Sequence, residues 1–346
     1  GVNFGYSLLW AMLLSIIATY VLQEMSARLG IITQKGLADV IKQELSNPLI
    51  RNSVITLIFS AIIIGNASYE AGNIGGATLG MEALFGLSYN NLYPAILGLA
   101  AFSLLFFGNY KSLEKVFIFL VLIMSLSFVM TAVLTQPNLW ELVKGLFVPS
   151  IPEDGILTII ALVGTTVVPY NLFLHAALVS EKWKSEKDLK LAKRDTLVSI
   201  ILGGLVSISI IISAAAIKST EVNNVLDMAK ALEPLYGSSA LYFMGIGLLS
   251  AGITSAITAP LAAAYVANSC FGWKAEFKDA KFRFIWILIL VLGVVFLSFG
   301  IKPIEIIKFA QITNGLLLPI IAIFLLWVVN RVGVMGKYKN TLVQNC

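Results

Sequence analysis

Residues 164–175 are apolar enough to sit in a membrane, yet they do not suit a continuous helix. Apolar sequence runs on both sides for long enough to cross a bilayer, but Gly164 and Pro169 weaken the helix, and five polar side chains fall within twelve residues. A broken helix at membrane depth is tolerated only where it is buried in protein or lines a cavity. Secondary transporters build substrate sites from such breaks. The sequence therefore predicts a solute transporter, with its site near Val167–Asn171 and a non-helical gap at 166–170 that faces a cavity.

The composition is that of a membrane protein. Hydrophobic residues make up 58% of the chain and charged residues 12%, with a mean hydropathy of +0.89, whereas a soluble domain is roughly one quarter charged. Nine apolar segments approach or exceed the ~20 residues of a spanning helix. They lie at about 6–25, 53–80, 92–108, 115–135, 156–181, 195–216, 239–268, 283–300 and 304–330. We expect an all-α polytopic membrane protein with a single transmembrane transport domain over residues 1–346.

Lysine and arginine are distributed unevenly among the segments that connect these spans. One set of alternate segments carries nineteen of them and the other set carries four. The positive-inside rule makes the richer set cytoplasmic, including the C-terminus. The net charge of +5 then reflects membrane topology and not nucleic-acid binding. We expect an integral protein of the plasma (inner) membrane, with the lipid bilayer as a partner and no nucleic acid.

This orientation places the first residue outside, although the chain starts with Gly1 and shows no signal peptide. The simplest explanation is a first helix upstream of the given sequence, which makes at least ten spans. Ten spans divide into an inverted repeat of five plus five helices, and the broken helix then opens the second set. Residues 1–135 would be the rest of the first repeat and residues 156–330 the second.

The second span carries Asn66, Glu70 and Asn73, whose spacing puts them on one helix face. An acid inside a membrane is costly and usually functional, which makes Glu70 and Asn73 candidate pathway groups. The alternative is a boundary residue that snorkels to the interface. A second face would let a neighbouring helix approach closely, because it carries small residues at every fourth position: Gly72, Gly76 and Gly80.

In the interrupted helix, Val168, Asn171 and His175 share a face, because they are spaced at i, i+3 and i+7. His175 is the only histidine, and histidine changes charge near neutral pH, so a proton-handling role competes with that of a hydrogen-bonded interior residue. The hydroxyls of Thr165 and Thr166 have a local alternative, in which they satisfy backbone groups freed by the break.

The last span carries Gln311 and Asn314 one turn apart. We expect them to face the bundle interior, although helix–helix hydrogen bonding alone could also explain them. No enzyme motif is recognisable, and Cys270 and Cys346 form no plausible metal or disulfide framework. We therefore expect a protein that is not an enzyme and needs no cofactor.

Five segments, taken in order, resemble the Nramp family of divalent-metal transporters along nearly all of the chain. Residues 4–10 and 25–31 are similar to the family's second helix, and Glu70 and Asn73 fall where its third helix usually has an aspartate and a glutamate. Val168-Pro169-Tyr170-Asn171-Leu172-Phe173-Leu174-His175 is similar to the sixth-helix signature Met-Pro-His-Asn-Leu-Tyr-Leu-His. Residues 251–258 look like the polar eighth helix, and 311–319 like the tenth-helix pattern of a glutamine followed by a proline.

The resemblance implies the LeuT-type fold and a divalent metal as the substrate. It implies broken first and sixth helices. The implied site combines a first-helix Asp-Pro-Gly-Asn motif, which the given sequence does not contain, with a sixth-helix methionine sulfur, a backbone carbonyl and the tenth-helix glutamine. On this chain the candidates are the Thr165 carbonyl, the space beside Val168, and Gln311. Candidate groups for the transport pathway or for protons come from several spans: Glu70, Asn73, Tyr170, Asn171, His175 and Asn314.

The departures from the family pattern bear on ion preference. Val168 stands where the family has methionine, Tyr170 where it has histidine, and Asn73 where it has a charge. Thioether sulfur suits soft metals, whereas oxygen and water suit magnesium, calcium and manganese. We therefore expect a hard-ion preference, magnesium- or manganese-like, by alternating access, with proton symport left open. The alternatives are a LeuT-fold transporter of a non-metal solute, and a membrane sensor or scaffold that does not transport.

Overall fold

A computed structural model describes residues 1–88, 91–107, 111–217, 222, 224–273 and 276–345. Every regular element in these ranges is a helix. The long helices are α1 (Leu9–Thr33), α3 (Pro48–Phe85), α5 (Lys111–Leu134), α9 (Leu189–Ala215), α12 (Ala240–Phe271), α13 (Ala280–Ser298) and α14 (Pro303–Val329). The others are α2 (Leu37–Glu44), α4 (Tyr93–Phe107), α6 (Leu139–Phe147), α7 (Ile156–Thr166), α8 (Pro169–Lys182), α10 (Val225–Ala229), α11 (Glu233–Tyr236), α15 (Val332–Met335), α16 (Leu342–Asn345) and four 3-10 turns.

Eight stretches of the described chain are long and apolar enough to cross a membrane, with α7 and α8 together forming one of them. The ninth predicted span, α4, is shorter at 15 residues. A helix of that length rises roughly 22 Å, less than the ~30 Å of a bilayer core. The predicted spans are therefore present as helices, although α4 alone does not reach across.

Local signals fix where several of these helices begin and end. The side chain of Asn47 accepts hydrogen bonds from the backbone N–H groups of Leu49 and Ile50, and Pro48 occupies the first helical position of α3. Helix α1 runs on to Thr33, beyond the predicted end near residue 25, and stops where Gln34 takes a left-handed conformation with φ of 53°. Helix boundaries thus follow caps more closely than hydropathy.

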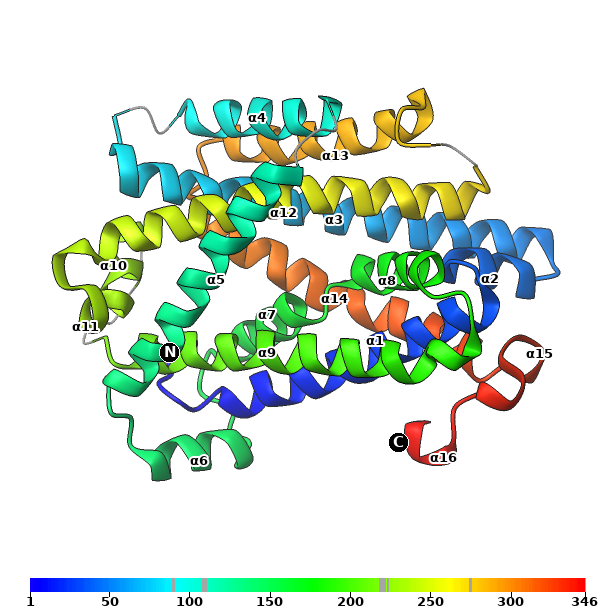
Figure 1. Ribbon diagram of the computed structural model, residues 1–346, viewed down its shortest axis with the longest axis horizontal. Coiled ribbons are helices and arrows are strands. Elements are labelled where there is room, and N and C mark those ends of the chain that lie inside the picture. The colour runs from blue at the N-terminus through cyan, green and yellow to red at the C-terminus, as the bar shows by residue number, and fades with distance from the viewer. Residues whose placement is uncertain (89–90, 108–110, 218–221, 223, 274–275, 346) are drawn as a thin grey trace.

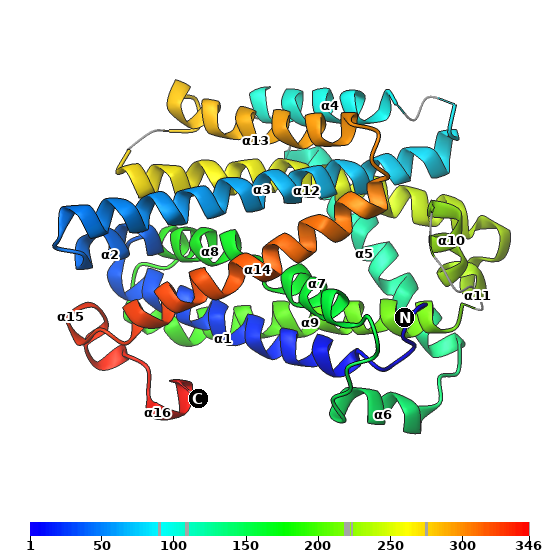
Figure 2. The same cartoon turned by 180° about the vertical axis from the view of Figure 1, so that it is seen from behind.

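The helices form layers (Figures 1 and 2). Helices α3 and α12 lie side by side through the middle, with α4 and α13 packed outside them. Helices α1 and α9 lie on the opposite side, and α7, α8 and α14 run between the two groups. The glycine face predicted on α3 makes close contact mainly at Gly80, where a Cβ would meet the backbone of Leu249 on α12. A Cβ at Gly76 would meet nothing within 4 Å, so the predicted close approach is found at Gly80 and not at Gly76.

Candidate functional site

The break predicted in the apolar helix is confirmed. Helix α7 ends at Thr166 and α8 begins at Pro169, and the two valines between them have non-helical backbones. Their φ and ψ angles are −102° and 84° for Val167, and −81° and 121° for Val168. Because Pro169 has no N–H, it cannot donate to the carbonyl of Thr165 four residues earlier. The break therefore leaves that carbonyl without its usual helical partner.

The side chains at the break are buried in protein. Val167 and Val168 are 1% and 4% exposed, and both belong to an apolar core cluster that also contains Tyr170. The prediction that the gap faces a cavity is wrong for these side chains. Both valines pack in the protein interior, because burying an apolar side chain away from water is favourable. Val168 also caps α8 from outside the helix, so it does not continue the helical face of Asn171 and His175 as predicted.

The two threonines at the end of α7 bond back along their own helix. The Thr165 hydroxyl donates to the carbonyl of Ala161 at 2.7 Å, and the Thr166 hydroxyl donates to the carbonyl of Leu162 at 2.8 Å. Such back-bonding is common for threonine in helices. These carbonyls lie within α7 and are not freed by the break, so the local alternative for the hydroxyls is wrong. The Thr165 backbone carbonyl remains the candidate ligand.

Helices α7 and α14 touch at glycines beside this carbonyl. A Cβ on Gly164 would collide with the carbonyl oxygen of Gln311, and a Cβ on Gly315 would collide with the carbonyl oxygen of Ile160. This close packing brings the end of α7 next to Gln311, as the sequence predicts. Gln311 also lines a cavity of about 540 Å³ between the N-terminal residues, α7 and α14, whose lining includes neither Thr165 nor Val168.

Glu70 is fully buried in the middle of α3. Its Oε2 accepts a hydrogen bond from Asn73 Nδ2 at 3.2 Å, and its Oε1 has no partner among the described residues. A Cβ on Gly293 would lie 2.6 Å from Glu70 Cγ, which shows that the side chain packs against α13. The alternative of a snorkelling boundary residue is therefore wrong, because the carboxylate stays inside the bundle.

Asn314 also points into the bundle, toward α3. The side chain is 1% exposed, and a Cβ on Gly65 would lie 3.3 Å from Asn314 Oδ1. Neither amide atom of Asn314 has a hydrogen-bond partner in the described part of the chain. Helix–helix hydrogen bonding, the alternative reading for this residue, is thus not what holds it there.

The polar residues of α8 face different neighbours. The ring of Tyr170 meets that of Tyr69 on α3 edge-on, with centroids 5.7 Å apart. His175 Nε2 lies 3.4 Å from the hydroxyl of Thr196 on α9, where either atom can donate depending on the histidine tautomer. Asn171 is half-buried. The candidate pathway residues therefore fall into a group around α3 and a separate contact between α8 and α9.

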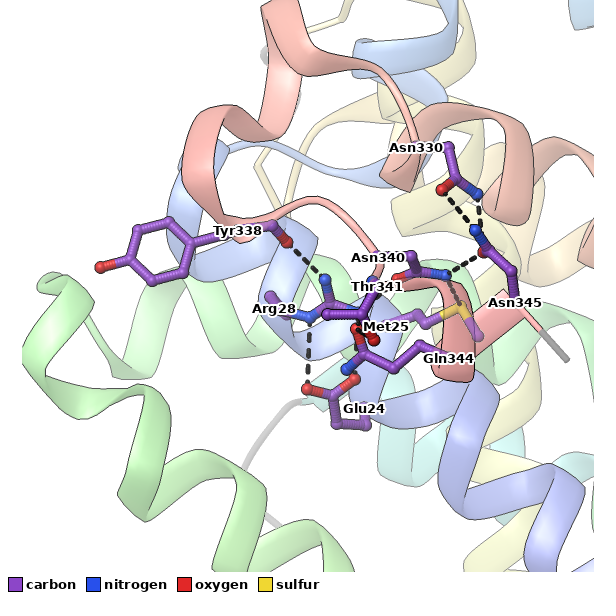
Figure 3. Close-up of polar contacts among 9 residues, drawn as sticks. All are labelled: Glu24, Met25, Arg28, Asn330, Tyr338, Asn340, Thr341, Gln344 and Asn345. Atoms are coloured by element: carbon purple, nitrogen blue, oxygen red, sulfur yellow. Dashed lines mark hydrogen bonds and ion pairs between the residues drawn. The ribbon is translucent and has the colours of Figure 1, made fainter.

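One end of the bundle is closed by a polar network around Arg28 (Figure 3). The guanidinium pairs with both carboxylate oxygens of Glu24 at 3.1 and 3.2 Å, and donates to the Tyr338 carbonyl and to Asn340 Oδ1 at 2.5 and 2.7 Å. Only 7% of Arg28 is exposed. The charge asymmetry of the sequence gives Arg28 only a place in the topology, whereas its i, i+4 spacing from Glu24 is the sequence signal for this ion pair.

Helix α2 joins α12 at the same end. Ser269 Oγ donates to Asp39 Oδ2 at 2.5 Å and accepts from the Asp39 backbone N–H at 3.1 Å. Burial raises the pKa of Asp39, while the hydrogen bond from Ser269 opposes the rise. Tyr338 and Lys337 also reach Glu186 before α9. Three of the charge-rich segments predicted to share one side of the membrane, 26–52, 182–194 and the tail after residue 330, thus meet at one end of the molecule.

Comparison with solved structures defines the class of protein. A crystal structure of the Eremococcus coleocola manganese transporter, in complex with an aromatic bis-isothiourea substituted compound, superposes with a TM-score of 0.79. It is 21% identical and covers 99% of this chain and 77% of that one. Mhp1, a nucleobase-cation-symport-1 family transporter, matches with a TM-score of 0.57 at 16% identity, over 97% and 72% of the two chains. The protein is an all-α membrane protein with the LeuT-type fold.

Sequence comparison identifies the family. The profile described as natural resistance-associated macrophage protein-like matches residues 1–346. The divalent metal cation transporter MntH of Yersinia pestis is 30% identical over 323 residues, which span 87% of this chain and 77% of the relative. The MntH of Erwinia tasmaniensis is 28% identical over 357 residues, covering 100% and 84%. The chain belongs to the Nramp family, as its motifs predict.

Proposed function

We propose that this protein moves a divalent metal cation across the membrane by alternating access. The observation that carries the proposal is the break between α7 and α8 beside Gln311, in a chain whose relatives are named divalent metal cation transporters. The C-terminal end of α7 is the negative end of a helix dipole, and it bears the Thr165 carbonyl that Pro169 leaves without a donor. Helix ends of this kind coordinate cations in transporters with broken helices.

The ion preference follows from the donor atoms at the break. Val168 contributes no ligand, so the proposed contacts are the oxygens of Thr165 and Gln311, completed by retained water. Oxygen ligands suit magnesium and manganese better than soft ions such as cadmium. The metal is the substrate of this process, not a resident cofactor, and no enzymatic activity is proposed.

The proposal also covers the internal repeats of the protein and its orientation in the membrane. Residues 1–135 and 156–330 would belong to two inverted repeats, with the break opening the second. The C-terminus and the network around Arg28 would face the cytoplasm of a cell whose inner membrane holds the protein, which the nineteen-to-four charge asymmetry supports. Any coupled proton would use Glu70 with Asn73, or His175 with its neighbour Thr196.

Uptake by the full-length natural protein in reconstituted vesicles tests this proposal. We expect accumulation of manganese or magnesium that saturates with concentration, with weak competition from cadmium. Vesicles that accumulate no divalent cation under an imposed pH gradient or membrane potential would refute metal transport. That result would leave the non-metal transporter and the sensor or scaffold as the readings to pursue.

A further inference from the structure

Arg283, at the end of an apolar helix, is a cation without a counter-ion among the residues that the structure describes. It lies in the first turn of α13, and its Cζ sits 4.6 Å above the ring of Phe106 on α4. Its Nε is buried and makes no hydrogen bond, and it forms no ion pair with any residue that the structure describes. Asp279, four residues earlier, directs its carboxylate to the backbone N–H of Glu276 at 2.8 Å.

Two other arginines of the protein form ion pairs with glutamates. Arg28 pairs with Glu24 at 3.1 Å, and Arg331 pairs with Glu44 at 3.6 Å. Within the described part of the chain, Arg283 instead meets the face of an aromatic ring, which attracts a cation but does not neutralise it. At a membrane boundary an uncompensated guanidinium favours an anion from outside the protein.

The surroundings of Arg283 are apolar and exposed at the surface of the molecule. Helices α4 and α13 lie together at the outer edge of the molecule in both views (Figures 1 and 2). Phe107 and Phe284 are 78% and 63% exposed beside the charged end of the pair. Exposed phenylalanine rings suit the hydrocarbon region, and a basic residue beside them marks the boundary with the headgroups. Behind Phe106, the ring of Phe102 stacks on it with centroids 5.6 Å apart, which holds the aromatic platform in place.

We propose that the Arg283 guanidinium binds the phosphate of an anionic phospholipid headgroup at this corner of α4 and α13. A guanidinium donates through a planar fork that matches two phosphate oxygens. The exposed rings of Phe107 and Phe284 provide apolar surface for the acyl chains, which a free phosphate ion does not need. The ligand is therefore a lipid, held by charge at its head and by apolar contact below.

Lys281 supplies a matched control. It belongs to the same turn of α13, and its Nζ also sits over an aromatic ring, that of Trp273, at 5.3 Å. Its side chain is exposed, and it lies two residues from Arg283, so it projects from a different side of the helix. A general attraction of basic residues to an anionic membrane would depend on both cations equally, whereas a built site depends on Arg283.

The experiment is native mass spectrometry of the full chain in detergent, titrated with phosphatidylglycerol, phosphatidylcholine or inorganic phosphate. We expect tighter binding of phosphatidylglycerol than of phosphatidylcholine, and a loss of about fivefold in that preference in Arg283→Gln, which corresponds to about 1 kcal/mol for one basic residue. Lys281→Gln should keep the preference. Arg283→Lys, which keeps the charge but lacks the fork, should retain part of it and guards against misfolding of the first variant.

Three outcomes would overturn the proposal. Equal losses in Arg283→Gln and Lys281→Gln would mean general electrostatic attraction. An unchanged preference in Arg283→Gln would mean that the lipid binds elsewhere. Displacement of phosphatidylglycerol by millimolar inorganic phosphate, with direct phosphate binding, would make this a site for a free anion and not for a lipid.

Discussion

The contact between α7 and α14 gives a sharp test of the proposed site. A Cβ on Gly164 would lie 3.0 Å from Gly315 Cα and closer still to the carbonyl oxygen of Gln311. Both neighbours are backbone atoms, which cannot rotate away as a side chain can. Since ordinary van der Waals contact begins near 3.4 Å and the oxygen contact falls far short of it, Gly164→Ala must push the two helices apart by on the order of an ångström.

That displacement is larger than a metal site tolerates. Metal–ligand distances hold to within about 0.2 Å, so moving the end of α7 away from Gln311 should separate the Thr165 carbonyl from the glutamine. Overpacking of this kind costs about 1–3 kcal/mol, while replacing a helical glycine by alanine returns about 0.5–1 kcal/mol. We expect a net destabilisation of about 1–2 kcal/mol and a fall in uptake of at least about tenfold, since lost coordination adds to lost stability.

Gly203→Ala is the matched control, because a Cβ at this position on α9 would meet nothing within 4 Å. It should transport normally and unfold at the same temperature or a slightly higher one. The measurements are vesicle uptake of manganese and thermal unfolding in detergent, compared at equal expression. If Gly164→Ala matched the unmodified protein in both, the contact between α7 and α14 would not be what positions the site.

Four other predictions follow from the same structure. Val168→Met should add cadmium binding, measured by calorimetry, because it supplies a thioether, at a packing cost of order 1 kcal/mol; tight cadmium binding before the change would refute the reasoning. Glu70→Gln and His175→Ala should each alter uptake or its pH dependence between about pH 5 and 8, and normal transport by both would remove the pathway assignment. Cysteines placed at 184–190 should react in intact cells only with membrane-permeant reagents. Arg28→Met should cost about 2–3 kcal/mol in unfolding experiments by leaving the partly buried Glu24 carboxylate without its partner, and removing Glu24 as well should restore part of the loss.

The sequence predicts the break well because its cause is local. Pro169 lacks a donor whatever surrounds it, so the end of a helix before it follows from covalent structure. The apolar spans can be predicted for a similar reason, since each must satisfy its own backbone hydrogen bonds within the membrane. The proximity of Gln311 to the break is different in kind, because it depends on Gly164 and Gly315 meeting across two helices. The sequence shows both glycines but not their contact, and only the family resemblance places Gln311 beside the break.

Periodicity gives a helix face but not the neighbour that covers it. Asn66, Glu70 and Asn73 do follow the predicted face of α3, yet nothing in their spacing reveals that Glu70 meets Gly293 of α13. Val168 shows a further limit. Counting residues through it assumes a continuous helix, and the same proline that predicts the break also removes the valine from the face of Asn171 and His175. A helical count is valid only as far as the helix extends.

The placement of the two titratable candidates constrains how protons could pass. Glu70 packs against α13, whereas His175 meets Thr196 on α9, and these two helices lie in opposite layers of the bundle (Figure 1). The groups therefore have no direct contact through which one could hand a proton to the other. Residues that share no partners usually act independently, so the effects of Glu70→Gln and His175→Ala on uptake should multiply in the double variant. A double variant no worse than the poorer single one would place both groups on one path, and would require a connection through water or through movement of α8.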